Sequence, residues 1–111
     1  MIESIVCSWL NGCLEVPAYM EHPEEKEDSY VIIEKTGSNE TNRLKSATLA
    51  IQSYDVTLEK AALLNEAVKT AMDRLAENDE VSACRLNSDY NSTDTASKRY
   101  RYQAVFTIFY Y

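Results

Sequence analysis

Residues 99–111, RYRYQAVFTIFYY, alternate between two sets of side chains almost without a break. The first set is mostly aromatic and apolar, and it consists of Tyr100, Tyr102, Ala104, Phe106, Ile108 and Tyr110. The second set is more polar, and it consists of Arg99, Arg101, Gln103, Val105, Thr107 and Phe109. A period of two predicts a β-strand with one buried face. We therefore expect the first set to pack against a helix. We also expect this strand to be packed against the rest of the protein and not frayed.

A hairpin is predicted upstream of this strand. Residues 30–35 (YVIIEK) are rich in β-branched side chains, and residues 43–54 alternate with an apolar inward side. Residues 36–42 (TGSNETN) contain nearly every turn-forming residue type and predict a loop. Together the three segments predict two long strands joined by a polar loop.

A long amphipathic helix is predicted after the hairpin. Thr57 can cap its first turn, where Glu59 favours the positive end of the helix dipole. Its apolar stripe is broad enough to cover a sheet and comprises Leu58, Ala61, Ala62, Leu64, Val68, Met72, Leu75 and Ala76. We expect the helix to end at Asn78 and Asp79.

The remaining segments complete the predicted fold. Residues 1–11 predict a short amphipathic helix, residues 14–20 an extended segment, residues 81–90 a strand and residues 91–97 a polar loop. The predicted fold class is α+β, with a mostly antiparallel sheet in the order α-β-β-β-α-β-β. One long helix packs across the sheet, and all 111 residues form one domain.

Negative charge is concentrated in one part of the chain. The formal net charge is −7, and residues 15–40 alone carry eight carboxylates against two lysines. An acidic chain repels phosphate backbones, which disfavours a nucleic-acid-binding protein. Residues 21–28 predict a solvated surface loop, with an acidic docking patch as the alternative.

Two further features bear on location. No stretch approaches the roughly 20 apolar residues that a membrane-spanning helix needs. The first residues, MIESI, lack the basic region of a signal peptide. We therefore expect a cytoplasmic protein without a membrane partner.

The residue types needed for catalysis or metal binding are few and scattered. His22 is the single histidine, and it lacks the neighbours of a Ser-His-Asp or Cys-His arrangement. Gly12 and Gly37 stand alone, so no glycine-rich phosphate loop is predicted, and the carboxylates near His22 lack EF-hand spacing. The three cysteines form no C-x-x-C pair. We expect no enzyme activity, no metal and no cofactor.

The basic residues of the last strand admit two interpretations. Arginines interleaved with tyrosines can bind single-stranded nucleic acid by stacking on bases. Here the two residue types fall on opposite faces of the strand, which favours core packing with a charged outer face. The surface that remains is suited to other proteins, and a chain with acidic and basic regions can associate head to tail. Our candidate interface residues are Arg43, Lys45, Arg99 and Arg101.

An ordered series of segments carries a resemblance to a known family. The series comprises VIIEKTG at 31–37, AIQSY at 50–54, AAxxNExVKxAM at 61–72, LNSDYN at 86–91 with TDT at 93–95, and YRYQAVF at 100–106. From residue 30 onward the chain thus resembles tail-terminator (tail-completion) proteins of long-tailed bacteriophages and prophages.

The resemblance implies a small α+β fold with helices flanking a sheet, and a structural role without catalysis or cofactor. Members of the family assemble as hexameric rings on the last ring of the tail tube, where they stop polymerisation and provide the head-joining surface. The implied partners are further copies of the chain, the tail-tube protein and a head–tail connector or completion protein. Loops 36–42 and 91–97 are expected to face the tube and the lumen. The protein itself is expected in the host cytoplasm during assembly and afterwards in the virion tail.

Two alternatives remain open at the level of sequence. The chain can be another structural component of the neck or tail, such as a head-completion or minor tail protein. It can also be a small hydrolase or ligand-binding α+β domain, although the single histidine and isolated glycines count against this alternative.

Overall fold

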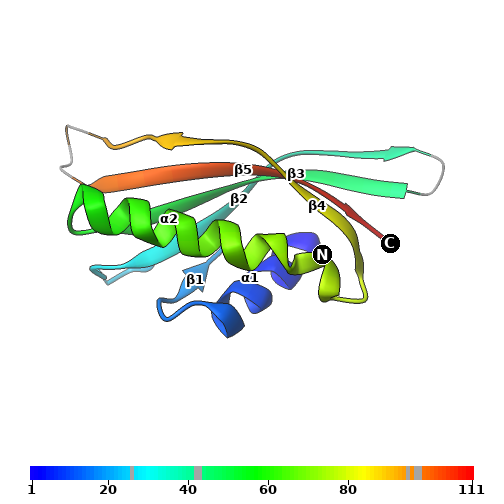
Figure 1. Ribbon diagram of the computed structural model, residues 1–111, viewed down its shortest axis with the longest axis horizontal. Coiled ribbons are helices and arrows are strands. Elements are labelled where there is room, and N and C mark those ends of the chain that lie inside the picture. Colours follow the sequence, from blue (N-terminus) through cyan, green and yellow to red (C-terminus); the bar gives the residue numbers. More distant parts are fainter. Residues whose placement is uncertain (26, 42–43, 95, 97–98) are drawn as a thin grey trace.

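The computed structural model describes residues 1–25, 27–41, 44–94, 96 and 99–111. The helices are α1 (Ile2–Cys13), α2 (Leu58–Asp73) and the short 3-10 helix η1 (Leu75–Glu77). The strands are β1 (Ala18–Tyr19), β2 (Tyr30–Thr41), β3 (Leu44–Asp55), β4 (Val81–Asn91) and β5 (Tyr100–Tyr110). The protein is therefore an α+β domain with a five-stranded sheet and two α-helices, as the sequence predicts (Figure 1).

The sheet departs from the predicted arrangement in two ways. The strand order is β1-β2-β3-β5-β4, and β1 runs parallel to β2, so the sheet is mixed. The parallel pair forms because the chain after β1 returns to the same end of the sheet, where the Val31 N–H donates to the Pro17 carbonyl at 3.0 Å. The order of elements also differs from α-β-β-β-α-β-β, because η1 follows α2 and keeps Leu75 fully buried.

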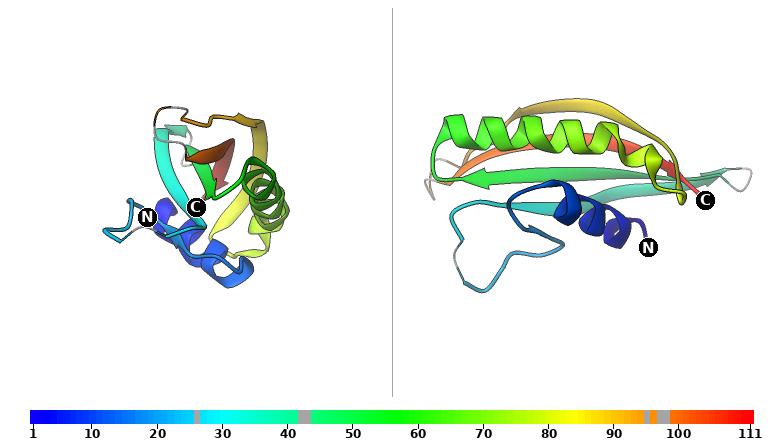
Figure 2. Two further views of the ribbon diagram at one scale, coloured as in Figure 1. Left: turned by 90° about the vertical axis from the view of Figure 1, so that its left-hand side faces the viewer. Right: turned by 60° about the horizontal axis from the view of Figure 1, so that its bottom comes forward.

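One face of the sheet carries both helices. Helix α2 runs along β3 and β5, while α1 packs beside it near β1 and β2 (Figures 1 and 2). The core between these layers is formed by alternate residues of the strands and the buried stripes of the helices, including Val6, Leu10, Val31, Ile33, Leu49, Ile51, Val68, Met72, Phe106 and Ile108. The prediction for the last strand is confirmed at Ala104, Phe106 and Ile108, which are all buried. Tyr100, in contrast, is exposed.

The predicted loop at residues 36–42 is wrong for its described part. Strand β2 continues to Thr41 and pairs with β3 up to Leu44, with one β-bulge between Lys35 and Gly37. Residues 36–41 are exposed, and their backbone groups still pair with β3. The polar composition of this segment therefore reflects that both faces of a projecting hairpin are in contact with solvent. The polarity of side chains depends on their exposure to solvent, and it does not report whether the backbone is paired.

The two long hairpins end at opposite ends of the molecule. The chain measures 44 × 25 × 24 Å, and the strands lie along its longest dimension. In Figure 1 the β2–β3 hairpin ends on the right and the β4–β5 hairpin ends on the left. One elongated sheet therefore presents a separate hairpin at each end.

The first turn of α2 provides a prediction about stability. The Lys60 N–H donates to the Thr57 Oγ1 at 3.1 Å, which confirms the predicted cap. We expect Thr57→Ala to lower the free energy of unfolding by about 1 kcal/mol, because a first-turn N–H loses its acceptor. Urea denaturation measures the loss. Thr70→Ala is the matched control, because Thr70 is exposed in the same helix and alanine favours helix; an equal loss in both variants would contradict the capping role.

Candidate functional site

The helix-free face of the sheet carries a cluster of tyrosines and arginines. Tyr30 and Tyr54 are cross-strand partners on β2 and β3, and their rings stack with centroids 4.8 Å apart. The Arg99 guanidinium lies 5.3 Å from the Tyr30 ring centroid and 5.8 Å from that of Tyr54. Arg101 lies 5.7 Å from the Tyr54 ring centroid and donates to the Tyr54 hydroxyl at 3.1 Å. Both arginines are thus bound to aromatic faces of their own chain.

The acidic segment before β2 contacts this cluster. The His22 ring packs edge-on against Tyr54 at a centroid distance of 5.4 Å. The Glu27 carboxylate accepts from the Tyr19 hydroxyl at 2.7 Å, while the Glu27 carbonyl accepts from Arg99 at 3.1 Å. The hydrogen bond to Glu27 raises the pKa of Tyr19 above its ordinary value. These contacts tie the acidic segment to the basic C-terminal strand within one molecule.

The structure places the four candidate interface residues differently. Arg43 lies outside the described residues, and Lys45 is exposed near the start of β3. Arg99 and Arg101 lie on the face away from the helices, as predicted, but they are half-buried against the tyrosines. A role for the four residues in an interface stays a prediction.

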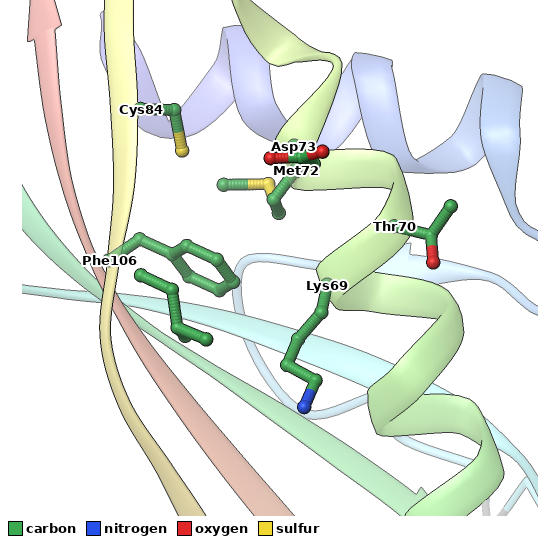
Figure 3. A pocket seen from close by; sticks show the side chains of 7 residues that line it. Lys69, Thr70, Met72, Asp73, Cys84 and Phe106 are labelled. Carbon is green, nitrogen blue, oxygen red and sulfur yellow. The ribbon is translucent and has the colours of Figure 1, made fainter.

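A shallow groove separates α2 from β4 (Figure 3). Its volume is about 300 Å³, and it is lined by Lys69, Thr70, Met72, Asp73, Cys84, Leu86 and Phe106. Met72 and Phe106 form an apolar floor, while Lys69 lies on the helix side (Figure 3). Asp89 of β4 bonds across to α2, accepting from Lys69 at 3.0 Å and from Asn65 at 2.9 Å.

Cys84 is half-buried in this groove. Desolvation raises the pKa of the Cys84 thiol from its ordinary 9.0 to about 12, with a smaller contribution from the Asp73 carboxylate. At pH 8 a pKa of about 12 leaves about a thousandfold less thiolate than a pKa of 9.0. Because only the thiolate is nucleophilic, we expect iodoacetamide to alkylate Cys84 much more slowly than an unshifted thiol. The folded state binds this proton more tightly, so the contribution of Cys84 to stability is present below pH 9 and lost as the pH rises towards 12.

Mass spectrometry of the alkylated peptides over time measures this difference. Cys13, which is exposed, is the internal reference, and alkylation in urea should remove the protection of Cys84. Alkylation of Cys84 in the native protein as fast as that of Cys13 would contradict the prediction.

A second and larger groove borders the free edge of β2. Strand β1 pairs only with Val31 and Ile32, so the groove opens where β1 stops. It has a volume of about 640 Å³ and is lined by Met1, Glu3, Met20, Glu21, His22, Ile32, Ile33, Glu34, Lys35 and Gln52. The Glu3 Oε2 atom lies 3.9 Å from the Lys35 Nζ atom. The Glu3 Oε1 atom is buried and has no hydrogen-bond partner among the described residues. The groove therefore combines exposed methionines with three carboxylates.

The groups needed for metal binding form no cluster among the described residues, at His22 or elsewhere. These residues contain no group of three or more His, Cys, Asp or Glu side chains that could hold a metal ion. His22 Nδ1 lies 3.4 Å from the Tyr30 hydroxyl. Across the described ranges, no helix is both long and apolar enough to cross a membrane.

Comparison with known proteins adds no relative. Neither a protein-family model nor a curated protein matches this sequence. The likeness to tail terminators therefore stays an expectation that rests on the ordered segments of the sequence.

Proposed function

We propose that the protein is a structural component of a phage or prophage tail, which caps the tail tube as a hexameric ring. In this role it stops tube polymerisation and provides the surface that joins the head. The observation that carries the proposal is the pair of hairpins at opposite ends of one elongated sheet. A terminator must present two different surfaces, one to the tube and one to the head, and this arrangement supplies one hairpin for each.

The charge of the chain supports the same role. A ring through which DNA passes gains from a surface that does not attract phosphates. The net charge of −7 meets this condition, and the half-buried arginines of the tyrosine cluster are engaged within the subunit. Lys45, at the end of the β2–β3 hairpin, remains exposed for contact with a neighbouring protein.

The test is tube polymerisation in the presence of the protein. The tail-tube protein of the same phage is assembled with and without this chain, and tubes are measured by electron microscopy. We expect a ring at one end of each tube and an end to further growth. Unrestricted growth without ring binding would contradict the proposal, and binding to purified heads instead of tubes would favour a head-completion protein.

A further inference from the structure

We propose that β4 of one subunit pairs antiparallel with the free edge of β2 in a second copy of the chain, so that the sheet continues from subunit to subunit. The proposal rests on the ring assembly described above and identifies its lateral contact. It concerns the two long sides of the sheet, whereas the hairpins occupy its two ends.

Both sides of the sheet have unpaired backbone. Beyond Ile32, no other strand among the described residues pairs with the outer side of β2. Strand β4 is the opposite edge, and within the described part of the chain it pairs with β5 alone, from Val81 to Asn91. Most side chains of both segments are exposed. Unpaired edges of this length are templates for the addition of another strand.

The directions of the two edges are compatible. The pairs β2–β3, β3–β5 and β5–β4 are all antiparallel, so β4 runs opposite to β2 within one subunit. A rotation about an axis along the strands preserves these directions. It therefore brings β4 of one copy beside β2 of the next as an antiparallel pair, the geometry of an ordinary sheet.

The register within the sheet places charges in complementary positions. Arg85 pairs with Thr107 of β5, Thr107 pairs with Thr48 of β3, and Thr48 pairs with Gly37 of β2. Residues connected in this way across the strands lie at one level of the sheet, so Arg85 and Gly37 share a level on the helix-free face. If this level continues across the contact, Arg85 lies diagonal to Glu34 of the next copy. Arg85 is exposed and has no ion pair among the described residues, whereas Glu34 lies in an acidic groove.

The β-bulges of the two edges lie at adjacent levels of the sheet. Strand β2 has its bulge between Lys35 and Gly37, on one side of the level of Leu49, and β4 has one between Leu86 and Ser88, on the other side of that level. Each edge therefore has one extra residue across this region, and the proposed pairing has the same register on both sides of the two bulges. On the helix side, Leu86, which is 41% exposed, then lies next to the groove that Met1 lines, itself 73% exposed.

Two different edges make a heterologous contact. Such a contact generates a ring when the rotation closes, whereas pairing of β4 with β4 would close as a dimer. The lateral contact therefore predicts cross-links between β2 and β4 and none between identical strands.

Disulfide cross-linking can test the lateral contact, because the two outer strands of one subunit are too far apart to be linked to each other. Asn39 of β2 and Ala83 of β4 lie at one level of the sheet, because Asn39 pairs with Ser46, Ser46 with Phe109, and Phe109 with Ala83. Three strand spacings separate them within a subunit, which is about 14 Å. A disulfide requires Cα atoms within roughly 7 Å, so these positions can link only between subunits. In a Cys13→Ser background, we expect oxidised N39C/A83C protein to form a covalent ladder that ends at six chains.

Matched variants identify the surface. The pair N39C/L63C carries the same number of exposed thiols but places one on the outer side of α2, where Leu63 is 62% exposed, so no ladder is expected. The single variant A83C should form no disulfide-linked dimer. Dimers of A83C would overturn the proposal in favour of a β4–β4 contact. Wild-type rings on tubes without a ladder in N39C/A83C would overturn the lateral contact alone and leave the proposed function standing.

A charge exchange tests the contact without depending on disulfide geometry. We expect R85E to raise the concentration of half-assembly about tenfold, because it places two carboxylates together. The double variant R85E/E34R should restore assembly. No change in R85E, or no rescue in the double variant, would overturn the proposed pairing, with circular dichroism to verify that the variants fold.

Discussion

Replacing Phe106 with alanine is expected to lower the free energy of unfolding by about 3–5 kcal/mol. Phe106 is 2% exposed on β5, between Leu49 of β3 and Leu86 of β4, and it forms the floor beneath α2. Its removal leaves a cavity at the point where the helix meets the middle of the sheet. Two-state urea denaturation measures the loss.

Val105→Ala is the matched control for this prediction. Val105 is the adjacent residue on β5, half-buried on the helix-free face. We expect it to lose less than half as much stability, because none of the described helices packs on that side. Equal losses at both positions would contradict the assignment of Phe106 to the buried face.

Replacing Tyr54 with alanine is expected to lower the free energy of unfolding by about 2–4 kcal/mol, the second largest effect. Tyr54 is 6% exposed, stacks on Tyr30 and lies beneath both Arg99 and Arg101. Its loss removes the aromatic surface to which the acidic segment is also tied through His22. Faster proteolysis within residues 20–29 should accompany the loss of stability.

Tyr54→Phe separates the ring from the hydroxyl. It keeps the stacked ring and removes only the acceptor of the Arg101 hydrogen bond, so we expect a loss of about 1 kcal/mol. A loss as large as that of Tyr54→Ala would show that the hydrogen bond, and not the aromatic stack, holds the cluster.

The sequence predicts the elements whose patterns are local. Alternation identifies β5 and its buried face, and the Thr57 cap identifies the start of α2, because each signal lies within one element. The length of β2 was not predictable in the same way. Its outer half is polar and is held in the sheet by backbone pairing with β3, which side-chain composition does not report.

The candidate site depends on contacts between distant segments. Tyr54 has the opposite parity to Leu49 and Ile51 on β3, so its position on the outer face follows from the sequence. Its stacking on Tyr30 requires the hairpin register, and its contact with Arg101 requires that β5 lie next to β3. The two free edges likewise follow only from the strand order, in which β2 and β4 become outer strands.

The mass of the wild-type protein at near-millimolar concentration, measured by sedimentation equilibrium, tests the head-to-tail ring most directly. The account predicts a closed assembly of six times the 12.7 kDa chain, which dissociates as salt screens the contact between Arg85 and Glu34. A monomer at every concentration and salt level, or a dimer that grows no further, would contradict it.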